Sequence, residues 1–146
     1  MAGLAGAALL VAATFATIIE IEVVTTREVA ANVDTQLSGE ERHGVALIVI
    51  AAAAVLMLLG ALRGAKPAML ALAALGITAL IITVGGDAPD LDDTGLIGEL
   101  YDSASAGPGT GFYLETLGAA LLLVAGGGLL VLGSGEREGK PSTSES

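Results

Sequence analysis

Four long apolar runs without a charged side chain constrain this sequence more than any other feature. They cover residues 3–19, 45–62, 67–84 and 117–132. Each is close to the length that an α-helix needs to cross a hydrocarbon core of about 30 Å. Because backbone polar groups must be satisfied internally in lipid, we expect one helix over each run. The apolar content of 53% agrees, since soluble domains average about 45–50%.

The predicted fold is therefore all-α: an integral membrane four-helix bundle that forms a single transmembrane domain over residues 1–134. The remaining residues, 135–146, are small and polar, and we expect them to be a disordered tail. The chain contains no cysteine, which excludes disulfides, thiolate catalysis and cysteine-ligated zinc.

The positions of the basic residues predict the orientation, because Lys and Arg near the ends of spans stay on the cytoplasmic side. Arg63 and Lys66 lie between the second and third runs, and Arg137 and Lys140 follow the fourth. Most of the acids that give the net charge of −10 lie in the other two connections, residues 20–44 and 85–116. We therefore expect both termini inside the cell and two acidic loops outside it.

The first acidic loop contains two local signals. The alternating, β-branched stretch "IEVVTT", which begins at Ile21, can continue the first helix or begin a short strand, and its composition slightly favours the strand. Ser38, followed by Glu41 three residues later, resembles a capping box before the second run.

The second acidic loop contains "DAPDLDDTGLIGELYD", residues 87–102, which partly matches a calcium-binding loop. Such a loop takes oxygen ligands from positions 1, 3 and 5, has Gly at position 6 and closes with an acid at position 12. Here position 12 is Tyr101, so the strongest ligand is missing. The stretch is either a solvated acidic loop or a weak divalent-cation site, whose candidate ligands are Asp90, Asp92, Thr94, Glu99 and Asp102.

His43 is the single histidine, and it lies beside Glu40, Glu41 and Arg42 at the start of the second run. A histidine near carboxylates can act as a general base or a metal ligand. The sequence shows no nucleophile or second histidine near it, so we interpret it as a surface histidine at the water boundary. No catalytic residue and no bound cofactor is predicted.

Small residues recur along the predicted helices at spacings that allow close packing in lipid. Glycine is costly inside a helix, by about 1 kcal/mol relative to alanine, so the triple glycine at 126–128 points to a helix contact. The predicted packing positions are Ala46, Ala53, Gly60, Gly64, Ala119, Gly126, Gly127 and Gly133.

The stretch "GPGTGFYLETLGAALLLVAGGGLLVLG", with its "GxGFYLxxxG" pattern before the fourth run, resembles the last span of small four-span membrane proteins common in actinobacteria. Most of those proteins have no assigned function. The resemblance covers the whole hydrophobic layout. It implies a location in a bacterial plasma membrane, but it implies no activity and no catalytic residues.

Two functions remain open on the sequence alone. The first is a non-enzymatic accessory or assembly component that contacts the lipid bilayer and a membrane or envelope partner, or a second copy of itself, but no nucleic acid. The second is a small transporter, channel or cation-responsive membrane protein that uses the acidic 87–102 loop. Transport needs polar groups inside the spans, and the runs offer only threonines, at positions 14, 17, 78 and 83.

Overall fold

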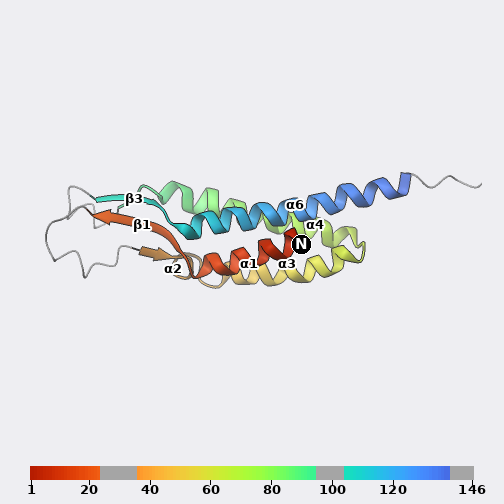
Figure 1. The fold of residues 1–146 in the computed structure, drawn as a ribbon, viewed down its shortest axis with the longest axis horizontal. Helices are drawn as coiled ribbons and strands as arrows, with labels where there is room; N and C mark the ends of the chain where they lie inside the picture. Colours follow the sequence, from red (N-terminus) through yellow and green to blue (C-terminus); the bar gives the residue numbers. More distant parts are fainter. Residues whose placement is uncertain (24–35, 95–103, 139–146) are drawn as a thin grey trace, which may run out of the picture.

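The computed structural model describes residues 1–23, 36–94 and 104–138, which form a bundle of helices with a small sheet at one end (Figure 1). A helix covers most of each apolar run. These helices are α1 (Ala2–Thr14), α3 (Ala46–Leu62), α4 (Lys66–Ile81) and α6 (Thr110–Glu138). A short helix, α2 (Gly39–His43), precedes α3. The π-helical turn η2 (Ile82–Asp87) and the 3-10 turn η3 (Ala88–Asp90) prolong α4.

Two of the helices are long and apolar enough to cross a membrane, namely Lys66–Asp90 and Thr110–Gly133. The other two apolar helices are shorter. At 1.5 Å per residue, the 13 residues of α1 reach only about 20 Å. The expectation of four full-length spans is therefore corrected to two long and two shorter apolar helices.

A three-stranded antiparallel sheet corrects the all-α prediction. β1 (Thr17–Val23) lies between β2 (Gln36–Ser38) and β3 (Ala104–Pro108). The first helix was expected to reach residue 19, but it ends at Thr14. The residues that follow are largely β-branched, and such side chains fit a pleated strand better than a helix.

The four long helices pack side by side in a ring. α1 contacts α3 and α6, and α4 contacts the same two helices, so α3 and α6 lie diagonally across the bundle. Small and medium apolar side chains fill the interior, with Leu10, Leu72 and Leu122 fully buried.

Glycines bring α6 unusually close to both of its neighbours. A Cβ on Gly118 would lie 2.9 Å from the carbonyl oxygen of Gly6 on α1. On the other side, a Cβ on Gly76 of α4 would lie 2.5 Å from the backbone nitrogen of Leu123, and one on Gly126 would lie 2.8 Å from the carbonyl oxygen of Met69. No side chain separates the helices at these points, so backbone packs on backbone.

Five of the eight predicted packing positions approach other elements or are at least half-buried. Ala119 and Gly126 are buried, and Gly60 approaches α4, where its Cβ would lie 2.9 Å from that of Ala68. Ala53 is half-buried, and a Cβ on Gly133 would make only an ordinary contact with Met69, at 3.9 Å.

Three of the predicted packing positions are corrected by the structure. Ala46 is exposed. Gly64 lies in the turn after α3 with a φ of 83°, so it serves the turn and not a helix contact. A Cβ on Gly127 would meet no atom within 4 Å, because the next residue of a helix points about 100° away from Gly126.

The structure corrects the first residues of the predicted tail. α6 continues to Glu138, so residues 135–138 are helical, and residues 139–146 lie outside the described part of the chain.

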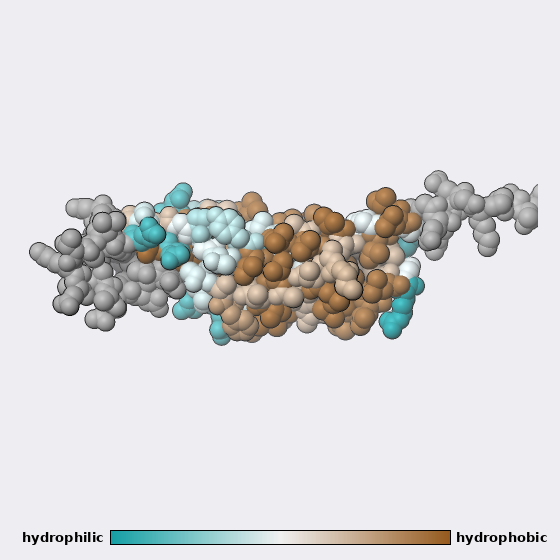
Figure 2. Space-filling view, viewed as in Figure 1, coloured by the Kyte–Doolittle hydropathy of each residue, from teal (hydrophilic) through white to brown (hydrophobic). Residues whose placement is uncertain are grey.

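The outer surface of the bundle is apolar. Figure 2 shows hydrophobic residues over the helices and hydrophilic residues toward the two ends. Large exposed apolar side chains occur on α3, α4 and α6, among them Leu56, Leu70, Ile77, Val124 and Val131. A helix that is apolar on all sides is suited to the core of a large protein or to a lipid environment.

Candidate functional site

A cluster of ionisable side chains lies at the end of the bundle next to the sheet. α2 supplies the first part of it. As predicted, α2 begins with a capping box: the backbone N–H of Ser38 donates to Glu41 Oε2 at 2.9 Å, and the N–H of Glu41 donates to Ser38 Oγ at 3.3 Å. The backbone N–H of Ser38, as the larger cause, and the Ser38 hydroxyl both donate to the Glu41 carboxylate and lower the pKa of Glu41. α2 ends at His43 and is followed by Gly44, whose φ of 55° suits glycine, and this places Arg42 and His43 at the bundle end.

Asp87 and Glu115 reach the same place from two other helices. Asp87 is the last residue of η2, and Glu115 lies in the second turn of α6. The side chains of both are fully buried, and that of His43 is only 10% exposed. Segments far apart in the sequence therefore bring two carboxylates and an imidazole together in a buried environment.

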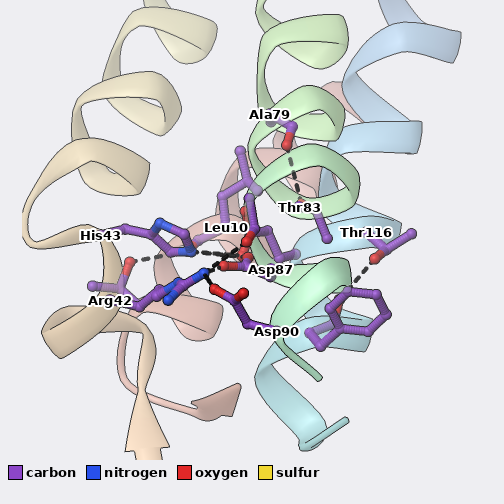
Figure 3. Close-up of polar contacts among 12 residues, drawn as sticks. Leu10, Arg42, His43, Ala79, Thr83, Asp87, Asp90 and Thr116 are labelled. Atoms are coloured by element: carbon purple, nitrogen blue, oxygen red, sulfur yellow. Dashed lines mark hydrogen bonds and ion pairs between the residues drawn. The ribbon is translucent and has the colours of Figure 1, made fainter. Parts of the chain in front are cut away.

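The distances between these groups are short (Figure 3). His43 Nε2 lies 3.0 Å from Asp87 Oδ2 and 3.5 Å from Glu115 Oε2. One nitrogen or oxygen atom from each of the three residues falls within 4.8 Å of the others. Within the described ranges, this is the one set of three or more His, Asp or Glu residues placed closely enough to hold a metal ion.

Arg42 holds the outer side of the cluster. Its Nε donates to Asp87 Oδ1 at 3.0 Å, its Nη2 donates to the carbonyl oxygen of Gly86 at 2.6 Å, and the same Nη2 donates to Asp90 Oδ2. The hydrogen bond to Asp90 is the main cause that raises the pKa of Arg42. The two oxygens of Asp87 are thus divided between two partners, with Oδ1 toward Arg42 and Oδ2 toward His43.

Glu115 differs from the other members, because neither of its buried carboxylate oxygens has a hydrogen-bond partner among the described residues. The nearby hydroxyl of Thr83 donates to the carbonyl oxygen of Ala79 in its own helix, at 3.0 Å. A buried charged carboxylate without partners is strongly unfavourable. Glu115 must therefore be neutral or balanced by a positive charge.

The structure corrects the interpretation of His43, which is nearly buried and directed at Asp87 instead of lying free at the surface. Asp90, the first candidate calcium ligand, pairs with Arg42. Asp92 is exposed and Thr94 is half-buried. Glu99 and Asp102 lie outside the described residues, so the calcium-loop prediction is not tested at its closing end.

Sequence reasoning missed Asp87 and Glu115 as partners of His43, although a signal was present. His43 shortly precedes the second apolar run, Asp87 shortly follows the third, and Glu115 shortly precedes the fourth. When helices of similar length pack side by side, residues just beyond the same end of each helix lie at the same level. Ionisable residues at these run ends were therefore candidates for one cluster.

Comparisons with protein-family models, with curated proteins and with solved structures give no match to this chain. The resemblance to four-span actinobacterial membrane proteins thus stays a prediction.

Proposed function

We propose that this protein is a multi-pass membrane protein of the bacterial plasma membrane that responds to cations at the end of the bundle next to its sheet. The observation that carries the proposal is the buried carboxylate of Glu115, whose oxygens make no hydrogen bond among the described residues. This carboxylate lies 3.5 Å from His43 Nε2 and beside a second buried carboxylate. Buried ionisable groups with few hydrogen bonds are concentrated at functional sites.

The membrane part of the proposal is supported by the apolar outer surface and by the two long apolar helices. A four-span arrangement requires α1 and α3 to cross together with the residues that flank them. The charge pattern places the turn with Arg63 and Lys66 in the cytoplasm, and the cluster and sheet outside.

The cluster favours a cation response over a pure assembly role. The assembly hypothesis drew on the outside loops and on glycine-bearing helix faces, but Gly76, Gly118 and Gly126 make contacts inside the bundle. These glycine-bearing faces contact neighbouring helices of the same chain, so they do not indicate a partner protein.

A non-enzymatic accessory role is the second candidate, and one observation favours it. Within the described residues, β2 and β3 each pair on one side only, with β1. The free edge of such a strand can accept a strand from an envelope partner or from a second copy of the chain.

The proposed response can be tested by thermal unfolding of the detergent-solubilised protein over a panel of divalent cations and over pH. We expect the unfolding temperature of the wild type to depend on a cation or on pH near neutrality, since only the folded state assembles the cluster. In Asp87→Asn this dependence should be lost, whereas the exposed-site variant Asp92→Asn should behave as wild type. Equal behaviour of all three proteins under every condition would refute the proposal.

A further inference from the structure

We infer that His43, Asp87 and Glu115 bind a divalent transition-metal ion of the zinc class. The inference rests on the proposed cation response and adds the identity of the ion and its ligands. Zinc in proteins takes imidazole nitrogen and carboxylate oxygen ligands, and a site with three protein ligands leaves one position for water or another molecule. Calcium and magnesium prefer oxygen ligands throughout, so the imidazole of His43 argues against both.

The distances fit a small tetrahedral ion. Zinc lies about 2.0–2.2 Å from nitrogen and oxygen ligands, so two ligands of one tetrahedral ion lie about 3.3 Å apart. His43 Nε2 lies 3.0 Å from Asp87 Oδ2 and 3.5 Å from Glu115 Oε2. These two separations bracket the tetrahedral value, and the third, between the ligand oxygens of Asp87 and Glu115, lies within 4.8 Å.

The charges also fit a divalent ion. Three carboxylates, those of Asp87, Asp90 and Glu115, meet one guanidinium, that of Arg42. If all three carboxylates are ionised and His43 is neutral, the cluster has a net charge of −2, and a divalent cation supplies two positive charges. Buried charges are stable when they are paired or coordinate a metal, and Glu115 has no partner among the described groups other than His43.

Arg42 has a positioning role in this site. By binding Asp87 Oδ1, it leaves Oδ2 directed at His43. Outer partners of this kind orient the ligands of metal sites, and their loss typically reduces metal affinity by about 10- to 100-fold. Because Arg42 also binds Gly86 and Asp90, it fixes the end of the α4 extension that carries the ligand.

A proton provides the competing explanation, because a protonated Glu115 also removes the unpaired charge. The two explanations differ in what the protein binds. A metal site takes up one ion per chain from a solution at constant pH, and it prefers zinc to calcium or magnesium. A proton site shows a dependence on pH and no saturable binding of metal.

The test is a calorimetric titration of zinc chloride into full-length, chelator-treated protein in detergent at neutral pH. A parallel titration with cobalt(II) chloride is followed by visible absorption. We expect one zinc ion per chain, binding that survives an excess of calcium and magnesium, and a cobalt spectrum of low coordination number. Glu115→Gln and His43→Gln should each weaken zinc binding at least about tenfold. The matched control Asp92→Asn removes an exposed carboxylate outside the cluster and should bind as wild type.

Absence of stoichiometric zinc binding by the wild type would overturn the inference, and so would an equal loss in Asp92→Asn. The cobalt spectrum of the wild type decides the question even if a ligand variant fails to fold. A response to pH or to calcium without zinc binding would refute the metal assignment and leave the proposed cation response intact. No response to any cation or to pH would refute both.

Discussion

The triple glycine of α6 gives the sharpest test of the packing, because its three members lie in different surroundings. A Cβ added to Gly126 would fall against the backbone nitrogen of Ala73 and 2.8 Å from the carbonyl oxygen of Met69. A Cβ added to Gly127 or Gly128 would meet no atom within 4 Å. The same substitution at adjacent positions should therefore have opposite effects.

The magnitude follows from two competing terms. Replacing glycine by alanine inside a helix gains about 1 kcal/mol from helix propensity alone. Forcing an extra methyl group into a closely packed site costs about 1–3 kcal/mol, and here the obstacles are backbone atoms, which cannot rotate away. We expect Gly126→Ala to lower the free energy of unfolding by up to about 2 kcal/mol. Gly127→Ala and Gly128→Ala should raise it by up to about 1 kcal/mol.

The measurement is reversible unfolding of each variant in mixed detergent micelles, titrated with a denaturing detergent and followed by far-ultraviolet circular dichroism. The Gly127→Ala and Gly128→Ala variants are the controls for helix propensity. If Gly126→Ala is as stable as these two, α4 and α6 do not pack backbone against backbone, and the described helix contact is wrong.

Two further predictions concern topology and pH. Single cysteines introduced by Ser105→Cys on β3 and Ala65→Cys before α4 should differ in their labelling by an impermeant maleimide. The cysteine at position 105 should be labelled in intact cells, and the cysteine at position 65 only after permeabilisation. The reverse pattern would show that the proposed orientation is inverted. The capping box lowers the folded-state pKa of Glu41, so its contribution to stability should be complete above the usual pKa of about 4.5 and lost as pH falls through the lowered value. Unfolding temperatures should therefore decline in acid more steeply for wild type than for Glu41→Gln, and parallel curves for the two proteins would contradict this.

The sequence was most informative where one local signal decides the structure. The second apolar run was predicted over 45–62, and α3 spans Ala46–Leu62, because uncharged residues fill the run and basic residues follow it. The capping box at Ser38 is confirmed. The sequence could predict it because its two residues interact with each other and need no tertiary partner.

Features that depend on tertiary contacts were not predictable in this way. Thr17–Val23 forms the centre of a sheet only because β2 and β3 lie on its two sides, and β3 comes from a distant part of the chain. Gly126 and Gly127 are the same residue type in one helix, and only the position of α4 distinguishes them.

The candidate site was missed for a related reason. His43 is alone in its own segment, and its partners follow it by 44 residues at Asp87 and by 72 at Glu115. Charge patterns along the chain predict which side of a membrane a loop occupies, but they do not predict which side chains meet. The sequence therefore predicts the acidic stretch beginning at Asp87 as an isolated loop, whereas in the structure Asp87 is buried and contacts Arg42 and His43 of α2.

The tight packing around α6 has a consequence for how an ion can move. Leu10, Leu72 and Leu122 fill the middle of the bundle with no exposed surface, and glycines bring the helix backbones together on both sides of α6. Apart from the cluster, the described interior is apolar except for Thr14 and Thr83, whose hydroxyls donate to backbone carbonyl oxygens of their own helices. An ion bound by His43, Asp87 and Glu115 should therefore arrive and depart at the end of the bundle next to the sheet, and the protein should bind the ion without conducting it across the membrane.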